Sequence, residues 1–186
     1  MKLAKLNDKA EIFHTIQGEG KNLGKPTVFL RTSLCNLHCI WCDTDYTWNW
    51  ENTPFETINN KKYKRENYII ELTKDEVAHQ VAQYKCDNVV LTGGEPMMQQ
   101  KELVELMDLL RQKDASYFFE VETNGTLKPH SEFDKLINQY NVSPKLSNSN
   151  NPLKIRIKPD AMTFFASSAK SNFKFVISEE ADLQEV

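Results

Sequence analysis

Three cysteines within one short segment are the feature that most limits what this chain can be. The segment SLCNLHCIWCDTDYTW spans residues 33–48 and contains Cys35, Cys39 and Cys42. Three thiols are too many for one disulfide and too few for a zinc site built from four cysteines. In a reducing compartment, clustered thiols bind metal or carry out redox chemistry more often than they form disulfides. The segment therefore resembles a metal site that is one protein ligand short.

The size and composition of the chain predict one soluble domain. The chain has 186 residues, of which 40% are hydrophobic, so it can build a core of its own. Its formal net charge of −3 gives no argument for binding nucleic acid or an acidic membrane. The N-terminal sequence MKLAKLNDKAEIF lacks the apolar stretch of a secretory signal, and no apolar run is long enough to span a bilayer. We therefore expect a single domain over residues 1–186, located in the cytoplasm.

Three interpretations of the cysteine segment are open. In the first, His38 completes a Cys3His zinc site, but His38 directly precedes Cys39, and no second Cys or His pair follows. In the second, the thiols are unconnected and buried, which their close spacing disfavours. The third is a [4Fe–4S] cluster, which is normally held by four thiolates. With three thiolates, one iron keeps an open position that can bind a small molecule.

Strands and helices alternate along the predicted chain. Two strands come first, over residues 11–16 and 27–33, and the glycine-rich stretch 17–26 between them is a predicted loop. Thr73 and Glu76 form a capping box at the start of a helix that carries apolar residues at helical spacing. The remaining predicted strands cover residues 88–92, 117–123, 141–145 and 173–177, and the remaining predicted helices cover residues 101–113 and 131–140.

This alternation predicts an α/β fold with a mostly parallel sheet and right-handed crossovers. In such sheets, ligands bind at the carboxyl edge of the strands. Each unusual motif lies just after a predicted strand: QGEG, the cysteine segment, TGGEP, ETNGT and SPK. We therefore expect one shared site at this edge. The polar stretch 49–68, including the basic run KKYKR, is predicted to be a solvated loop.

The pattern Cys-x3-Cys-x2-Cys after an early strand, with Trp41 before the last cysteine and GGEP after a later strand, resembles the radical S-adenosylmethionine enzymes. The resemblance implies a [4Fe–4S] cluster whose open iron binds the amine and carboxylate of S-adenosylmethionine. The cluster then cleaves the sulfonium to a 5′-deoxyadenosyl radical that abstracts hydrogen from the substrate. A complete barrel of eight repeats needs about 200 residues or more. The expected fold is therefore a partial, open (β/α) barrel of the radical S-adenosylmethionine type.

Five motifs, FHTIQGEG, CDT, TGGEP, ETNGT and SPK, together resemble the 7-carboxy-7-deazaguanine synthase family. The resemblance implies a lyase that contracts 6-carboxy-5,6,7,8-tetrahydropterin to 7-carboxy-7-deazaguanine with loss of ammonia, on the route to queuosine and related bases. It implies Mg²⁺ as a further cofactor, an electron donor such as flavodoxin or ferredoxin, and a homodimer. That family usually continues past the segment matching FKFVISEEADLQEV with another strand and a His- or Lys-containing tail. Two alternatives follow: the C-terminal end is truncated relative to the family, or the substrate site is closed in another way.

The resemblance also implies roles for individual residues, with Arg31 clamping the substrate carboxylate and Glu122 as a catalytic candidate. The cluster ligands are Cys35, Cys39 and Cys42, and Thr44 supplies an oxygen to Mg²⁺. The S-adenosylmethionine contacts are Trp41, Gly93, Gly94, Glu95, Asn124, Ser143, Pro144 and Lys145. The pterin contacts are Ile16, Gln17, Gly18, Glu19, Arg31 and Thr92.

Several alternatives stand beside these roles. Glu19 and Glu122 are equally compatible with ordinary polar residues at strand ends, and GGEP with a tight turn from strand to helix. His14 and His38 are predicted to be structural, and Cys86 to be a packing thiol. A glycyl-radical-enzyme activase of the same superfamily shares the cysteine segment but has no need for QGEG or Thr44. A non-enzymatic zinc or iron–sulfur module is the alternative from a different class.

Overall fold

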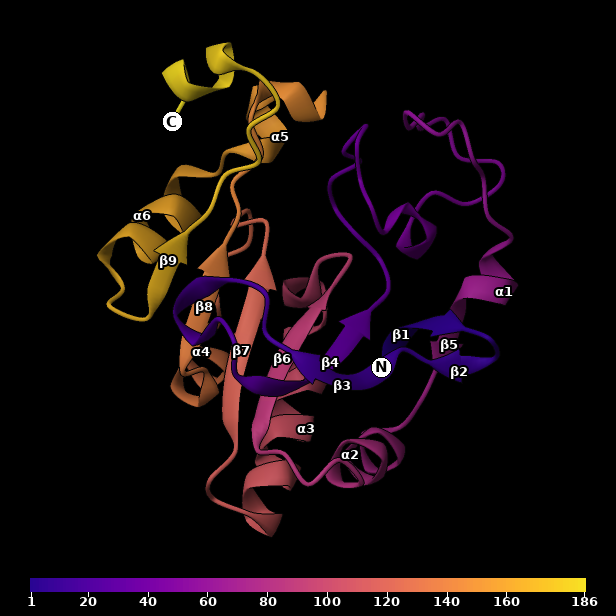
Figure 1. The fold of residues 1–186 in the computed structure, drawn as a ribbon, viewed down its shortest axis with the longest axis vertical. Helices are drawn as coiled ribbons and strands as arrows, with labels where there is room; N and C mark the ends of the chain where they lie inside the picture. The colour runs from indigo at the N-terminus through magenta and orange to yellow at the C-terminus, as the bar shows by residue number, and fades with distance from the viewer.

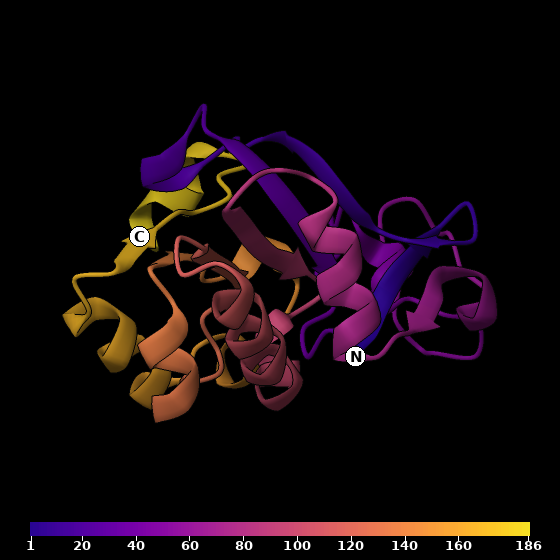
Figure 2. The same cartoon turned by 90° about the horizontal axis from the view of Figure 1, so that it is seen from below.

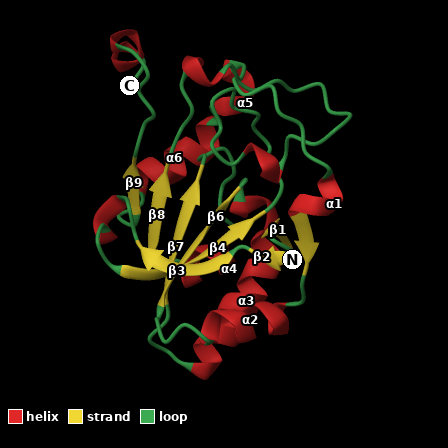
Figure 3. Ribbon diagram, turned by 45° about the vertical axis from the view of Figure 1, so that its right-hand side comes forward, coloured by secondary structure: helices red, strands yellow, loops and turns green.

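The computed structural model describes residues 1–186 and contains one nine-stranded sheet with strand order β2-β1-β4-β6-β7-β8-β9. The neighbours from β4 onward are all parallel. The sheet does not close, because β2 and β9 lie at opposite ends of this order, and its parallel strands fan apart toward their carboxyl ends (Figures 1 and 3). These strands are β4 (Pro26–Thr32), β6 (Asn88–Gly93), β7 (Phe118–Thr123), β8 (Gln139–Val142) and β9 (Ser171–Phe173). The predicted open α/β barrel is confirmed.

The N-terminal part of the sheet is antiparallel. The predicted strand at 11–16 is β3 (Ile12–Ile16), which pairs with β4 in antiparallel register. The hairpin of β1 (Lys2–Leu6) and β2 (Lys9–Ala10), together with β5 (Ile69–Glu71), was not predicted. Asn7 and Asp8 both have positive φ, as the central residues of a type I′ turn do. The Asn-Asp pair was the available signal for this hairpin.

Side chains alternate strictly between the two faces of the parallel strands. Apolar residues such as Leu30, Leu91 and Val121 belong to one hydrophobic core cluster, together with fully buried Leu103 and Leu110 of α3 (Gln100–Lys113). This face is covered by α2 (Lys74–Ala82), α3, α4 (Ser131–Leu136) and α6 (Pro159–Ser167) (Figure 2). The alternate positions are largely polar and face the other way. The alternation of side chains along each strand thus gives the sheet an apolar face under the helices and a polar face on the other side.

The capping box predicted for α2 is present. The Glu76 amide donates to Thr73 Oγ1 at 3.3 Å, and the Thr73 amide donates to Glu76 Oε2 at 2.8 Å. These two bonds satisfy backbone donors that have no partner within the first helical turn. No helix of the structure is both long enough and apolar enough to cross a membrane.

Three predicted elements were wrong in extent. The helix expected at 131–140 ends at Leu136, and β8 begins at Gln139 rather than residue 141. Ile137 and Tyr140 continue the helical spacing of Phe133, but they are buried where the chain turns into the sheet. The strand expected at 173–177 is β9, which ends at Phe173. The short helices α1 (Arg65–Tyr68) and α5 (Leu153–Arg156), and also α6, were not predicted.

Candidate active site

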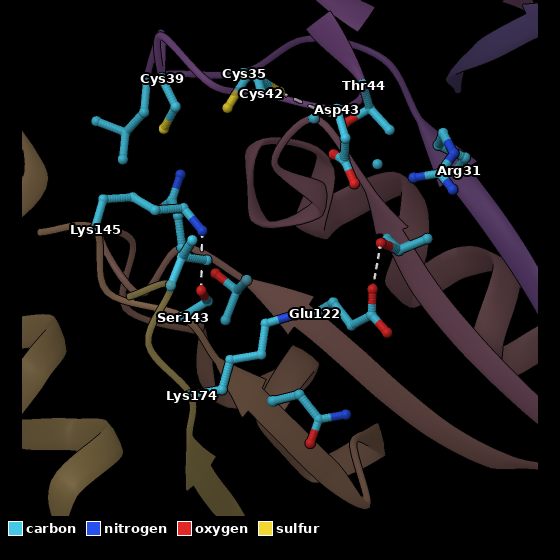
Figure 4. Close-up of a pocket in the computed structure, with 18 of the residues that line it drawn as sticks. Arg31, Cys35, Cys39, Cys42, Asp43, Thr44, Glu122, Ser143, Lys145 and Lys174 are labelled. Carbon is cyan, nitrogen blue, oxygen red and sulfur yellow. Dashed lines mark hydrogen bonds between the residues drawn. The ribbon is translucent and has the colours of Figure 1, made fainter. Parts of the chain in front are cut away.

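A cavity of about 590 Å³ opens at the carboxyl edge of the parallel strands (Figure 4). It collects residues from the loops after β3, β4, β6, β7, β8 and β9, as expected for one shared site. The predicted site residues on its wall are Gln17, Gly18, Glu19, Arg31, Cys35, Cys39, Trp41, Cys42, Thr44, Thr92, Gly93, Gly94, Glu122, Asn124, Ser143 and Lys145. The predicted residues that do not line it are Ile16, Glu95 and Pro144.

The three cysteines are grouped at one end of the cavity and carry free thiols (Figure 4). The segment follows β4 directly and is held open by backbone bonds: the Leu34 amide donates to the Thr47 carbonyl at 2.9 Å, and the Ile40 amide to the Ser149 carbonyl at 3.1 Å. Leu34 has a φ of 77°, which turns the chain sharply before the first cysteine. The geometry presents three sulfurs to one space.

Burial disfavours the thiolate forms of Cys35 and Cys39 when no metal is bound. It raises the pKa of Cys35 far above its ordinary value and that of Cys39 to about 11. A thiol that coordinates metal is deprotonated outright, so a bound cation would offset this cost. Two N–H groups also point at sulfur: Asn151 Nδ2 lies 3.3 Å from Cys39 Sγ, and Trp48 Nε1 lies 3.5 Å from Cys42 Sγ. The residues fit an iron–sulfur cluster.

A single-ion zinc site fits less well. No group of three His, Cys, Asp or Glu side chains is arranged to hold one metal ion. A cubane cluster takes each sulfur on a different iron, so its ligands need not converge on one point. The ring of His38 is stacked on Phe55, with 3.4 Å between centroids, and meets Trp48 edge-on. His38 therefore packs as predicted.

The two glycines of GGEP are required by a close approach between backbones. The Gly94 amide donates to the Thr32 carbonyl at 3.0 Å, and the Glu95 amide to the Leu34 carbonyl at 2.8 Å. A Cβ on Gly94 would lie 2.0 Å from the Leu34 carbonyl oxygen, and Gly93 has a φ of 120°. The glycines hold the end of β6 against the start of the cysteine segment. We had expected them to admit a ligand, so the structure supplies a second reason for them.

Substituting Gly94 should therefore destabilise the fold. Overpacking costs about 1–3 kcal/mol, and the obstructing atom here is backbone, so Gly94→Ala should lower the urea midpoint clearly. Gly18→Ala is the matched control, because a Cβ at Gly18 meets nothing within 4 Å, and its stability should change by no more than about 0.5 kcal/mol. Equal midpoints for the two variants would contradict this account of GGEP.

The side chain of Glu95 was expected at the S-adenosylmethionine site, but it is fully buried behind the cavity wall. Its carboxylate accepts bonds from the Met97 amide at 3.0 Å, Thr123 Oγ1 at 2.9 Å and the Asn124 amide at 2.8 Å. Burial raises the pKa of Glu95, and these three donors oppose that rise. Glu95 therefore ties the GGEP turn to the ETN turn. Ile16 is 63% exposed and does not line the cavity, so its contact with the pterin stays a prediction.

The wall across from the cysteines is polar and densely bonded. Thr92 Oγ1 donates to Glu122 Oε2 at 2.7 Å, and Gln17 Nε2 lies 3.5 Å from Glu122 Oε1. Burial raises the pKa of Glu122, and the negative charge of nearby Glu19 raises it further. Glu19 forms an ion pair with Lys174, which follows β9. The loop between β3 and β4 thereby crosses the inner face of the sheet (Figure 1).

Arg31 lies at the edge of the cavity with part of its guanidinium already engaged (Figure 4). Its Nε donates to Glu11 Oε1 at 2.7 Å, and Tyr46 donates to the other Glu11 oxygen at 2.8 Å. Glu11 thus forms an ion pair with Arg31. The Arg31 side chain lines the cavity beside Thr44 (Figure 4).

The remaining predicted residues form three smaller groups. Lys145 Nζ donates to Ser143 Oγ at 2.9 Å and lies 5.6 Å from the centre of the Trp41 ring. Asn124 Nδ2 donates to Asn36 Oδ1 at 2.9 Å. Thr44 precedes a 3-10 turn without capping it, and its hydroxyl lies 3.7 Å from Cys42 Sγ. The Thr44 hydroxyl is therefore hydrogen-bonded to the Cys42 sulfur at the cavity wall.

Sequence reasoning missed part of the wall. The residues concerned are Phe29, Leu37, Asp43, Trp48, Thr123, Asn141, Lys174 and Val176. Strand alternation was an available signal for two of them, since Phe29 lies two positions before Arg31 and Asn141 two positions before Ser143. Lys174 had no comparable signal, because its strand was predicted in the wrong place.

Comparisons with known proteins agree with this geometry. The profile of the Radical SAM superfamily matches residues 29–148. A 7-carboxy-7-deazaguanine synthase from Pyrobaculum aerophilum is 40% identical over 178 residues, covering 95% of this chain and 69% of the relative. A 7-carboxy-7-deazaguanine synthase from Halobacterium salinarum is 33% identical over 192 residues, and the match covers 95% of this chain and 66% of that relative. The crystal structure of QueE from Escherichia coli superposes with a TM-score of 0.63 at 26% identity, covering 94% of this chain and 72% of that one.

Proposed function

Because the chain belongs to the radical S-adenosylmethionine superfamily and, within it, to the 7-carboxy-7-deazaguanine synthase family, we propose that it contracts 6-carboxy-5,6,7,8-tetrahydropterin to 7-carboxy-7-deazaguanine with release of ammonia. The observation that carries the proposal is one cavity with three free thiols at one end and a polar wall across from them. The chain spans about two thirds of the length of these relatives.

Cys35, Cys39 and Cys42 hold the [4Fe–4S] cluster in this proposal. Together with S-adenosylmethionine, the cluster supplies the 5′-deoxyadenosyl radical that starts the reaction. The backbone at Gly93 and Gly94 and the side chain of Asn124 contact the methionyl part. Ser143, Lys145 and Trp41 contact the rest of S-adenosylmethionine, since their side chains line one wall beside the cysteines. Pro144 and Glu95 shape the turns that carry these contacts.

The pterin lies across the polar wall. The terminal nitrogens of Arg31 bind its 6-carboxylate in a bidentate pair, because a guanidinium fork matches a carboxylate. Glu122, oriented by Thr92, accepts from the donor edge of the pterin and is the candidate for moving a proton. Gln17, Gly18 and Glu19 close the site from the loop after β3. Asp43 and Thr44 lie beside this position, and Thr44 supplies one oxygen to Mg²⁺, which binds few protein oxygens.

Three further features complete the proposal. We propose that a flavodoxin or ferredoxin supplies the electron, that two copies of the chain form a homodimer, and that residues 1–186 act as one domain in the cytoplasm. The rival function is a glycyl-radical-enzyme activase, which would need a partner protein and no pterin. Anaerobic turnover of the reconstituted protein with the pterin separates the two, because only the proposed enzyme forms a deazaguanine.

Binding of the pterin should weaken on acidification because of Glu122. Its raised pKa means that the carboxylate takes up a proton at a higher pH than free glutamate does. The protonated form has less capacity to accept from the pterin, so KM should rise as the pH falls through this raised pKa. In Glu122→Gln, KM should be several-fold higher at neutral pH and flat with pH. Steady-state kinetics from pH 5 to pH 8 measure this, and Glu102→Gln on the exposed side of α3 is the control.

A further inference from the structure

The loop at residues 146–151 is built onto the cysteine segment. The Ile40 amide donates to the Ser149 carbonyl at 3.1 Å, and the His38 amide donates to Asn151 Oδ1 at 3.0 Å. Trp41 Nε1 donates to Asn148 Oδ1 at 3.2 Å. Consecutive residues around the second cysteine therefore depend on a loop that lies more than 100 positions away in sequence.

Asn151 has an orientation that its neighbours fix. Its Oδ1 accepts from a backbone N–H, so only Nδ2 can face the sulfur of Cys39, which lies at 3.3 Å. Nδ2 also lies near the carbonyl and the hydroxyl of Ser149, at 3.3 and 3.2 Å. Only 7% of Asn151 is exposed. A reversed amide would place Oδ1 against a sulfur that becomes a thiolate, and would leave His38 without an acceptor.

The loop at residues 146–151 is also hydrogen-bonded to the C-terminal segment of the chain. Asn148 Nδ2 donates to Asp182 Oδ2 at 2.7 Å, and the Ser147 amide and hydroxyl donate to Glu185 Oε2 at 2.8 and 2.7 Å. Asp182 also accepts from the Ser178 and Glu179 amides. The C-terminal segment thus holds the loop against the cysteine segment (Figure 1). Asn151 is mounted on a rigid support rather than on a free loop.

We propose that Asn151 is a positioning residue that donates its side-chain N–H to the Cys39 thiolate and raises the reduction potential of the cluster. This inference rests on the proposed function only for the presence of the cluster. Hydrogen bonds to the sulfurs help to set the potential of iron–sulfur clusters. One-electron reduction adds negative charge to the cluster, so an N–H donor stabilises the reduced form more than the oxidised form. Trp48 Nε1 at Cys42 is a weaker counterpart, at 3.5 Å.

Asn151→Asp tests the proposal, because aspartate keeps the acceptor for His38 and replaces the donor by a negative oxygen. Asn150→Asp is the matched control. Asn150 is exposed and left-handed, a conformation that aspartate tolerates. Asn151→Ala removes the donor without adding charge, and it covers the case in which Asn151→Asp fails to fold. The readout is the midpoint potential of the cluster in reconstituted protein without substrate, from a redox titration followed by electron paramagnetic resonance.

The quantity compared is the ratio of reduced to oxidised cluster at one fixed applied potential. In Asn151→Asp this ratio should be about tenfold lower than in the unsubstituted protein. That ratio corresponds to a midpoint about 59 mV lower. Asn151→Ala should shift in the same direction by less, and Asn150→Asp should match the unsubstituted protein. An unchanged midpoint in a fully loaded Asn151 variant overturns the inference while leaving the proposed function intact. Failure of the unsubstituted protein to assemble any cluster overturns the proposed function as well.

Discussion

Cys39→Ala should lose both its cluster and its turnover. Cys39 lies in the middle of the cysteine segment and supplies one of only three thiols that line the cavity. With two thiolates left, the cluster has too few ligands to persist. Iron and sulfide should fall to background after anaerobic reconstitution, and deazaguanine formation should fall below detection. Metal analysis and product chromatography on one sample measure both effects.

Cys86→Ala is the matched control for this loss. Cys86 is the only cysteine outside the cavity, and its thiol donates to the Pro26 carbonyl at 3.4 Å. Its removal should leave the iron content and the turnover unchanged and cost at most about 1–2 kcal/mol of stability, as a modest packing change does. A Cys39→Ala protein that keeps a full complement of iron and sulfide would falsify the assignment of the cluster ligands.

Arg31→Lys should weaken binding of the pterin while keeping a positive charge next to Glu11. Lysine keeps a positive charge beside Glu11, which otherwise would be left as a half-buried unpaired carboxylate. It lacks the planar fork that pairs with a second carboxylate, and the exchange at a bidentate site is not conservative. Losing one charge-assisted hydrogen bond costs about 1.5–3 kcal/mol. We therefore expect the Kd of 6-carboxytetrahydropterin to rise by roughly 10- to 150-fold.

Binding of a second ligand distinguishes a direct contact between Arg31 and the pterin carboxylate from a structural role of Arg31. A tetrahydropterin without the 6-carboxyl group should bind equally to Arg31→Lys and to the unsubstituted protein, because neither can use the fork on it. Anaerobic equilibrium binding of the two pterins to the two proteins gives four Kd values, which form a thermodynamic cycle for the contact between residue 31 and the carboxylate. Equal losses for both ligands would mean that Arg31 acts by supporting Glu11 and Tyr46 rather than by holding the carboxylate.

The sequence was informative where chemistry and local geometry share the same residues. The cysteine segment, GGEP and ETNGT each follow a strand, and parallel strands bring their carboxyl ends to one edge. That rule alone placed Cys35, Gly94 and Asn124 at one cavity, which the structure bears out. The capped helix α2 and the apolar face of α3 were predictable for the same reason, since each depends on neighbours a few positions away.

The rest depends on contacts between distant segments. Gln139 and Asn141 lie in a fully buried strand, but they face a polar inner wall, so β8 lacked an apolar strand pattern. Glu95 resembled a ligand-binding residue because nothing local shows that Thr123 and Asn124 bond its carboxylate. The partner of Arg31 is Glu11, on the stretch before β3. The loop at 146–151 had no motif at all, and its role emerged only from its bonds to the cysteine segment.

The central claim is that one cavity brings a three-thiolate cluster and a carboxypterin together. Its most direct test is anaerobic turnover of the reconstituted 186-residue chain with S-adenosylmethionine, Mg²⁺, a one-electron reductant and 6-carboxytetrahydropterin. Cys39→Ala serves as the blank. We predict many equivalents of 7-carboxy-7-deazaguanine per protein, with ammonia released in equal amount and S-adenosylmethionine largely retained. Cleavage of S-adenosylmethionine to 5′-deoxyadenosine without any deazaguanine would contradict the account.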